Sequence, residues 1–313
     1  MRTRLRIVAV LASFNVVPLL FLPVAMAQTK LTLGYTGANA FVAAFVAKDQ
    51  GYFSKRGLDV TLQLLPIISN IPPAMVGGSL QVGTLTPPAF LLTNEGGLDL
   101  QIVAGATVQS KANITTGIMA REGSNIKTAA DFRGKKVGVP GLNGVNHVTF
   151  MKWLKDRGVD PKQVIFIETS LPQMGDLLKI GQIDAVVPVE PFLGRIVQSK
   201  VGYVVAPYAA EVSESYLESF YIMTREFVQK NPKAARDFKE AIREAVDWIG
   251  KNEHGARMTQ VTYLKLPEAI AMSIRMPTLM VDVRPPDLQF WVDLCRDFGV
   301  TKGTATVQQG LFQ

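Results

Sequence analysis

Apolar and polar residues alternate along the chain in a pattern that predicts strands and helices in turn. From Val145 to Leu154, apolar residues recur at helical spacing, with charged residues on the other side. Runs typical of strands lie before and after this stretch, at 136–140 and 164–167, and Gly158 ends the helix between them. A strand, a helix and a second strand in this order form a βαβ unit, which favours a parallel sheet.

A turn of Gly and Asn residues, Gly141–Gly144, joins the first of these strands to the helix. The first N–H groups of a helix have no partner within it and carry a partial positive charge. Such a turn can hold an anion without Arg or Lys. A tight turn that binds nothing is the alternative for this one turn.

The same pattern occurs earlier, in residues 31–64, with a turn at Thr36–Asn39 and a helix at 40–48. The offset between the helix-ending residues Gly57 and Gly158 is 101 residues, and both lie in Arg-Gly-apolar-Asp. We interpret the repetition as two related α/β lobes. Chance similarity between ordinary α/β segments is the alternative.

Beyond a strand at 220–224 the pattern is helical, with no further strands expected. The predicted helices are 232–251, 259–263, 267–274 and 286–297. Because these helices have no strands of their own, we expect the chain to return to the first lobe and cover it. Two crossings follow, near 108–116 and near 212–220, and together they make a hinge beside a cleft where ligands usually sit.

The N-terminus is typical of an export signal. Three Arg residues precede an apolar run at 7–24, and Ala25-Met26-Ala27 has the small-x-small form of a cleavage site. We expect a signal peptide at 1–27, cleaved after Ala27, and a periplasmic mature protein that begins at Gln28. A membrane anchor is the alternative, against which Pro18 and Pro23 speak.

Composition excludes several classes of protein. Of 313 residues, 48% are hydrophobic and 19% charged, which is ordinary for a globular protein of two lobes. The single cysteine, Cys295, excludes an intrachain disulfide and a multi-cysteine metal cluster. Removal of the leader's three Arg lowers the net charge from +7 to +4, and no basic run interleaved with aromatics indicates nucleic acid. With only His147 and His254, and neither Gly-x-Ser-x-Gly nor His-Glu-x-x-His, we expect no enzyme, no metal and no cofactor.

Four segments resemble a known family. They are Gly51-Tyr-Phe-Ser-Lys-Arg-Gly-Leu-Asp-Val60, Asp131-Phe-Arg-Gly-Lys-Lys-Val-Gly-Val139, Gly181-Gln-Ile-Asp-Ala185 and Glu190-Pro-Phe192. In these the chain resembles the periplasmic substrate-binding proteins of ABC importers, in the nitrate, sulfonate and taurine group that also includes binders of thiamin pyrimidine precursors. The resemblance implies a two-lobed α/β fold of the type II periplasmic binding proteins. Each lobe is expected to be a mostly parallel sheet flanked by helices, with a ligand cleft between the lobes.

The resemblance also implies the domain organisation and the partners. Lobe 1 would comprise 28–110 plus 217–313, and lobe 2 would comprise 111–216. The partners would be a small-molecule ligand and an inner-membrane ABC permease with its cytoplasmic ATPase, and we expect a monomer.

In the family, ligand contacts come from turns at the sheet edges. Carried onto this sequence, they are Thr36, Gly37, Ala38, Asn39, Ser69, Asn70, Thr86, Pro87, Gln109, Asn143, Gly144, Val145, Asn146, Ser170 and Glu190. The second turn departs from the family pattern, because Leu142 and Val145 make it more apolar. This departure speaks against nitrate or taurine and leaves room for a larger carboxylate or sulfonate.

Several of these side chains have two interpretations. Asn143 either caps the helix or binds the ligand, and His147 is expected on the helix surface. Glu190 either faces the cleft, where it favours a cationic or donor-bearing ligand, or pairs with a basic residue between the lobes. Tyr216 and Tyr221 are expected in the core rather than stacked on a ligand.

The sequence therefore predicts a solute-binding protein for a small organic anion, a sulfonate or carboxylate, with an aromatic anion included. The alternatives are a binder of an aminopyrimidine thiamin precursor, or a pyrimidine-synthesising enzyme of the same fold. A sensory protein that presents its ligand to a membrane receptor is a third class, which the sequence does not separate from import.

Overall fold

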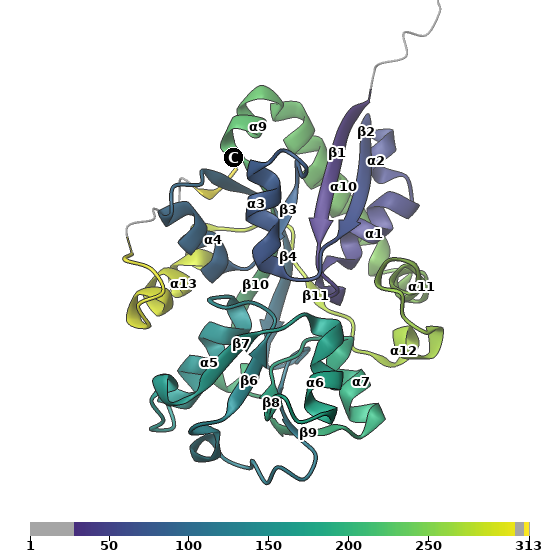
Figure 1. Cartoon of the computed structure of the whole chain (residues 1–313). Coiled ribbons are helices and arrows are strands. Elements are labelled where there is room, and N and C mark those ends of the chain that lie inside the picture. Colours follow the sequence, from purple (N-terminus) through teal and green to yellow (C-terminus); the bar gives the residue numbers. More distant parts are fainter. Residues whose placement is uncertain (1–27, 304–309, 313) are drawn as a thin grey trace, which may run out of the picture.

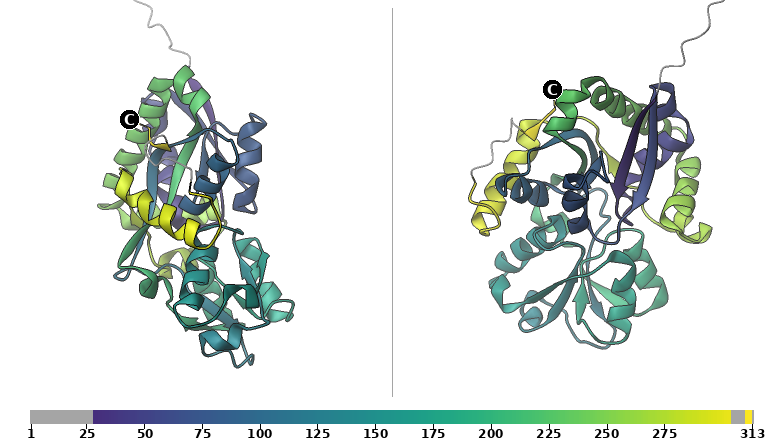
Figure 2. Two further views of the ribbon diagram at one scale, coloured as in Figure 1. Left: turned by 90° about the vertical axis from the view of Figure 1, so that its left-hand side faces the viewer. Right: turned by 45° about the horizontal axis from the view of Figure 1, so that its top comes forward.

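The computed structural model describes residues 28–303 and 310–312, and it has two lobes joined by long strands (Figure 1). The predicted signal peptide lies outside the described residues. The two further views in Figure 2 show the same separation, with the teal strands of the second lobe below those of the first. The expected two-lobed α/β fold is confirmed.

Two sheets form the first lobe. Strand β1 (Thr29–Tyr35) pairs in parallel with β2 (Leu58–Leu64). The second sheet has the order β11-β4-β10-β3, and its pairings are antiparallel. Its strands are β3 (Gly83–Leu85), β4 (Leu100–Ser110), β10 (Ser215–Thr224) and β11 (Thr278–Leu279). A parallel bridge from Leu33 to Val82 joins the two sheets.

Helices surround these sheets. They are α1 (Val42–Asp49), α2 (Tyr52–Lys55), α3 (Ile71–Val76), α4 (Pro87–Glu95), α9 (Arg225–Lys230), α10 (Pro232–Ile249), α11 (Glu253–Leu264), α12 (Glu268–Ser273) and α13 (Pro285–Asp297), with 3₁₀ turns at Asn39–Phe41 and Ile68–Asn70. Helix α10 has a buried apolar stripe that includes Phe238, Ile242 and Ile249, and it packs on α1 and α2. Phe238 stacks on Phe53 of α2, with ring centroids 5.3 Å apart.

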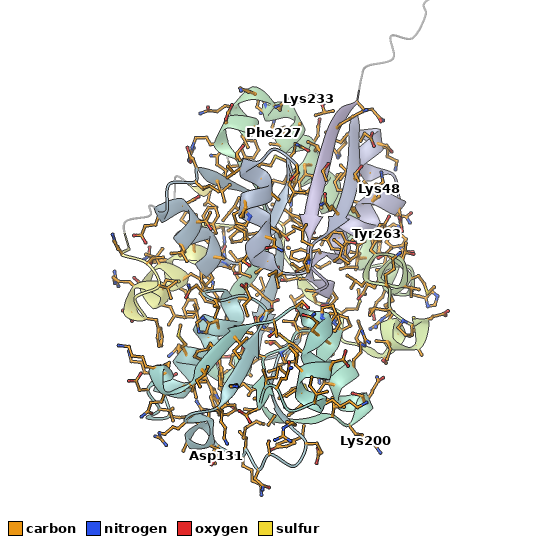
Figure 3. All side chains as sticks on the ribbon, in the orientation of Figure 1. Lys48, Asp131, Lys200, Phe227, Lys233 and Tyr263 are labelled. Atoms are coloured by element: carbon orange, nitrogen blue, oxygen red, sulfur yellow. The ribbon has the colours of Figure 1, made fainter. Side chains whose placement is uncertain are left out.

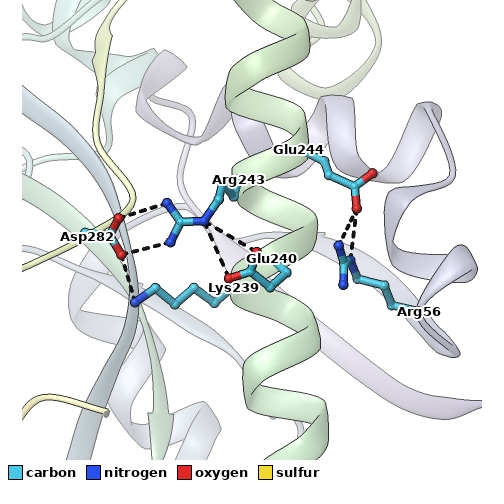
Figure 4. A network of polar contacts seen from close by, with 6 residues as sticks. All are labelled: Arg56, Lys239, Glu240, Arg243, Glu244 and Asp282. Carbon is cyan, nitrogen blue, oxygen red and sulfur yellow. Dashed lines mark hydrogen bonds and ion pairs between the residues drawn. The ribbon is translucent and has the colours of Figure 1, made fainter.

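Charged residues of α10 tie the C-terminal segment to the first lobe (Figure 4). Arg243 donates two hydrogen bonds to Asp282, at 2.8 and 2.9 Å, and Lys239 pairs with the same carboxylate. On the other side of the helix, Glu244 pairs with Arg56. The chain therefore returns to the first lobe after the second crossing, and α10 holds it there.

The second lobe is built on a five-stranded sheet with the order β7-β6-β8-β5-β9. Its strands are β5 (Ile118–Arg121), β6 (Lys136–Val139), β7 (Ile165–Glu168), β8 (Ala185–Val186) and β9 (Gly202–Ala206). Its helices are α5 (Val145–Lys155), α6 (Met174–Lys179), α7 (Phe192–Ser199) and α8 (Ala209–Val212), with 3₁₀ turns at Ala129–Phe132, Pro161–Gln163 and Leu171–Gln173. A cluster of aromatic rings around Phe150 fills the space between sheet and helices.

The sheets are more mixed than expected. Strands β7, β6 and β8 are parallel, as the βαβ pattern predicts, but β5 is antiparallel to both β8 and β9. The reason is that the crossing strands β4 and β10 run in opposite directions between the lobes. The prediction of helices alone after residue 224 is wrong for Thr278–Leu279, which pairs with β4 as β11.

The repeated turns are real features of the backbone. Gly57 and Gly158 have φ of +73° and +72°, and Gly78 and Gly181 have φ of +75° and +72°. Positive φ favours glycine, so the same turn chemistry occurs at equivalent places in both lobes.

Figure 3 places three labelled charged residues at the two ends of the molecule. Asp131 and Lys200 lie at the far end of the second lobe, and Lys233 lies at the opposite end, on the first. Among the helices that the structure describes, none combines the length and apolarity needed to cross a bilayer.

Candidate functional site

A cavity of about 70 Å³ lies where the two lobes meet. The first lobe contributes Thr36, Ala38, Asn39, Ala40, Phe41, Pro66, Ile67, Ile68 and Thr86. The second contributes Pro140, Gly141, Gly144, Val145, Asn146, Leu171 and Val189. Thr115, Glu218 and Ser219 come from the segments that cross between the lobes. Both lobes and both crossings therefore share one cavity.

The lobes touch each other at the edges of this cavity. The N–H of Val145, at the start of α5, donates to Thr86 Oγ1 of the first lobe at 3.3 Å. The N–H of Asn39 donates to the carbonyl oxygen of Glu190 at 3.2 Å. Gly141 lies so close to Ile68 that a Cβ atom there would be 2.7 Å from Ile68 Cγ2. The two lobes are therefore in direct contact around the cavity.

The turn before α5 is held by His147. Asn143 has φ of +58°, and its backbone N–H donates to His147 Nδ1 at 2.9 Å. Since Nδ1 accepts, the neutral ring carries its proton on Nε2, which has no hydrogen-bond partner among the described residues. Burial lowers the pKa of His147 to about 4, so the ring is neutral at pH 7. The expectation of a surface histidine is wrong, because the ring packs inward on Phe166, with ring centroids 4.3 Å apart.

Asn146 fixes α5 to the sheet of the second lobe. Its Nδ2 donates to Thr116 Oγ1 at 3.3 Å and to the carbonyl oxygen of Val187 at 3.2 Å. The side chain is buried, and it lines the cavity. It thereby aligns the first turn of α5 with the cavity.

Glu218 is the one ionisable side chain in the cavity wall, as far as the described residues go. It is 7% exposed, and Thr107 Oγ1 donates to its Oε2 at 2.9 Å. Burial raises the pKa of Glu218 to about 7, while the hydrogen bond from Thr107 lowers it in part. Sequence reasoning missed this residue, because a Glu between Leu217 and Ser219 in a strand gives no signal of a site.

Glu190 does not line the cavity. Its Oε2 accepts from the N–H of Gly194 in the first turn of α7 at 3.1 Å. Burial raises the pKa of Glu190, and the Gly194 hydrogen bond and the charge of Arg275 lower it in part. Glu190 therefore neither lines the cavity nor forms an ion pair with a basic residue among the described residues, and its hydrogen bond is to the start of α7.

Seven of the residues predicted from the sequence line the cavity. They are Thr36, Ala38, Asn39, Thr86, Gly144, Val145 and Asn146. Their contact with a ligand stays a prediction. Asn39 uses Nδ2 to donate to the carbonyl oxygen of Arg275 at 2.8 Å, and it does not cap a helix.

The other predicted residues lie around the cavity rather than in its wall. Ser69 and Asn70 are exposed, Pro87 is buried at the start of α4, and Gly37 lies against the ring of Phe192. Ser170 donates to Gln173, and Gln109 is buried on β4 and accepts from Thr115. Asn143 shapes the turn through its backbone and does not cap α5.

The apolar residues behave in two ways. Val145 lines the cavity, whereas Leu142 is not in its wall and is 45% exposed. Tyr216 and Tyr221 are buried in the core, as expected.

Neither metal nor thiol chemistry is indicated at this site. No group of three or more His, Cys, Asp or Glu side chains within residues 28–303 and 310–312 has a geometry that could hold a metal ion. Cys295 is buried in the first lobe, and burial raises the pKa of its thiol to about 12.

Residues 25–263 match the NMT1-like family. The chain belongs to that family. It is similar to the nitrate/nitrite binding protein NrtA of Nostoc sp., with 25% identity over 250 residues, which cover 74% of this chain and 57% of the relative. The chain thus spans little more than half the length of that curated relative.

Solved structures share the fold. The alkanesulfonate-binding protein SsuA of Xanthomonas axonopodis pv. citri, bound to MOPS, superposes with a TM-score of 0.78 at 18% identity, covering 92% of this chain and 99% of that one. The periplasmic nitrate-binding protein NrtA of Synechocystis also gives 0.78 at 18% identity, covering 91% and 86%. The desulfurization enzyme DSZB gives 0.64 at 13% identity, covering 91% and 96%, so this fold also carries catalysis.

Proposed function

We propose that this protein is the exported solute-binding component of an ABC importer. It captures a small organic molecule between its lobes in the periplasm and delivers it to a membrane permease with a cytoplasmic ATPase. The observation that carries this proposal is the cavity walled by both lobes and both crossings, with Val145 of one lobe bonded to Thr86 of the other.

Lobe closure is the proposed mechanism. We take the hinge to lie at the two crossings, near 110 and 216, so that lobe 1 is 28–110 plus 217–313 and lobe 2 is 111–216. A ligand that contacts both lobes has a higher affinity for the closed form than for the open one, and this difference shifts the population toward closure. The permease then recognises the closed form.

The names of the relatives favour an anionic ligand, and α5 directs its N-terminus at the cavity. Two features of the cavity wall speak against a purely anionic ligand. Most of the lining is apolar, and Val145 N–H, the first donor of α5, already bonds to Thr86. We therefore propose a small organic solute with an apolar body as the ligand and treat its charge separately below.

A binding role fits the cavity better than catalysis. Among the described residues, its wall holds no His, Cys or Lys, and its one acid, Glu218, bonds to Thr107, so it makes no hydrogen bond to Ser219 Oγ. Nucleophilic hydrolysis needs an activated nucleophile with a base.

A thermal-shift panel on the mature protein from Gln28 tests the function. The panel contains alkanesulfonates, nitrate, carboxylates, amines, amidines and aminopyrimidines. A ligand at 100 times its dissociation constant adds about 2.7 kcal/mol of stability, which raises the Tm by several degrees. We expect one class to raise the Tm.

Small-angle X-ray scattering with that compound supplies the second measurement. We expect the radius of gyration to fall on binding, because the lobes close. A stabilising compound that leaves the radius unchanged would contradict closure, and a panel with no active member would contradict the receptor role.

A further inference from the structure

Glu218 reaches the cavity because the strand β10 is irregular at this point. Leu217 pairs with Val108 and Ser219 pairs with Thr107, so Glu218 is an extra residue without a partner on β4. In a regular strand, neighbouring side chains point to opposite faces, yet Glu218 and Ser219 both line the cavity. A β-bulge re-aims a side chain in this way, and bulges are common beside functional sites.

One oxygen of the carboxylate, Oε2, accepts a hydrogen bond, and the other, Oε1, has no partner within residues 28–303 and 310–312. Ser219 Oγ and Thr107 Oγ1 lie 2.6 Å apart, and Thr107 Oγ1 donates to Glu218 Oε2. When Thr107 gives its single proton to Glu218, Ser219 donates to Thr107, so both hydroxyl groups support the carboxylate. No described residue donates to Oε1.

Among the residues that the structure describes, none in the cavity wall balances the charge of this carboxylate. The described wall contains no Lys, Arg or His. Two tyrosines interact electrostatically with Glu218, Tyr208 at the N-cap of α8 and Tyr216 of β10, and burial raises the pKa of both, so they stay neutral. A buried carboxylate without a counter-charge is unfavourable, and a ligand that brings positive charge or N–H donors relieves this cost.

We propose that Glu218 selects the ligand by charge and that the ligand carries an amine or amidine group that donates to Oε1, on a small apolar body. This inference rests on the proposed function and deepens it. It assigns the apolar residues Phe41, Ile68 and Leu171 to the body of the ligand, and it disfavours a sulfonate or carboxylate beside Glu218.

Isothermal titration calorimetry with matched probes tests the proposal. Benzamidinium and benzoate have the same shape and opposite charge, and acetamidinium and acetate form a smaller pair. We expect wild-type protein to bind at least one amidinium 10-fold or more tightly than its carboxylate. The isosteric variant Glu218→Gln should lose that preference.

Glu122→Gln is the matched control, because it removes the same charge from an exposed residue of the second lobe. It should keep the wild-type preference. Glu218→Asp provides a second variant if Glu218→Gln folds poorly. It retains the charge but withdraws it by one methylene, and the amidinium affinity should fall while the circular dichroism spectrum is unchanged.

Three results would overturn the proposal. They are a carboxylate that binds as tightly as its amidinium, a preference that Glu218→Gln leaves intact, and no binding of either amidinium. A carboxylate that binds and compacts the protein would remove the role of Glu218 while leaving the receptor function in place. Absence of closure with every solute would remove the function itself.

Discussion

At the scale of single residues, His147 shows how burial and one hydrogen bond fix a protonation state. Its Nδ1 must stay unprotonated to accept from Asn143, and its ring lies against Phe166 away from water. A proton on Nδ1 would break that bond and place a charge in an apolar setting. The turn that leads into α5 therefore depends on neutral His147.

This dependence predicts loss of stability in acid. The folded-state pKa of about 4 lies below the ordinary value of 6.5, so the contribution is complete above pH 6.5 and is lost as the pH falls toward 4. The loss is about 3 kcal/mol in the free energy of unfolding. Urea unfolding of wild type and His147→Asn at pH 7 and pH 4 should show it as a difference between the two proteins, since the Asn amide oxygen still accepts from Asn143 without titrating.

Wild type must be compared with His147→Asn because Glu218 changes the free energy of unfolding with pH in the opposite direction to His147. Its folded-state pKa of about 7 is raised above 4.5, so its contribution is complete below pH 4.5 and is lost as the pH rises to 7. In wild type alone, the two opposite pH dependences partly cancel in the measured free energy of unfolding. An equal pH dependence in wild type and His147→Asn would contradict the assignment.

Individual residues of the cavity differ in how far the sequence predicts their position. Thr86, Val145 and Asn146 follow strand ends or begin a helix, and the family resemblance placed them in the cleft because the family's ligand contacts come from such turns. Glu218 was not predictable, because its position in the wall depends on a bulge in β10. The pattern of apolar and polar residues in the sequence does not indicate that bulge. Glu190 was the more visible acid, but it is bound to the start of α7.

At the scale of elements, the start of α5 joins the two lobes. Gly144 is the N-cap residue and offers no side chain, so the Val145 N–H is free to bond across the cavity. Thr86, which accepts it, precedes α4 in the first lobe and makes no capping bond there. Under the proposed closure mechanism, this hydrogen bond forms only in the closed arrangement.

Thr86→Val should weaken ligand binding without weakening either lobe. In the closed form, the Val145 N–H would lose its acceptor, which costs about 1–3 kcal/mol, whereas in the open form water replaces it. We expect affinity for the solute that shifts the Tm most to fall about 10-fold, which corresponds to about 1.4 kcal/mol. Titration calorimetry measures the affinity, and the Tm without ligand should stay close to wild type.

Thr84→Val is the matched control for this change. Thr84 lies two residues earlier and is fully buried, and its hydroxyl has no partner among the described residues. Loss of that hydroxyl should leave affinity unchanged and should not lower stability. Equal affinity in Thr86→Val and wild type would mean that the hydrogen bond plays no part in closure.

The element pattern also explains which parts of the fold were predictable. Strands followed by helices at regular spacing predict parallel pairs, and β6, α5 and β7 form as expected. The strand β11 has two residues and pairs with β4 only because the returning chain passes beside it. So short a segment carries no periodicity, and tertiary contact alone decides its structure.

At the scale of the whole molecule, closure depends on how closely the two lobes approach. Gly141 of the second lobe faces Ile68 of the first, and both line the cavity. Carbon atoms in contact normally lie 3.5–4.0 Å apart. A Cβ atom at Gly141 would be 2.7 Å from Ile68 Cγ2, so the glycine is needed for the approach of the lobes rather than for its backbone angles.

Gly141→Ala should therefore hold the lobes apart. We expect the affinity for the solute identified by thermal shift to fall 10-fold or more, with a radius of gyration that stays at the open value in scattering. The fold of each lobe should be unaffected, because the clash exists only between lobes. Gly175→Ala serves as control, since a Cβ atom there meets Ile196 at an ordinary 3.6 Å within the second lobe.

A double-mutant cycle with Ile68→Ala separates closure from other effects. Ile68→Ala alone removes apolar contact from the cavity and lowers affinity, but in the Gly141→Ala protein it also removes the clash. We expect the double variant to bind more tightly than Gly141→Ala alone, which gives a coupling free energy between residues on opposite lobes. Additive losses would place the defect of Gly141→Ala inside the turn and would contradict closure at this contact.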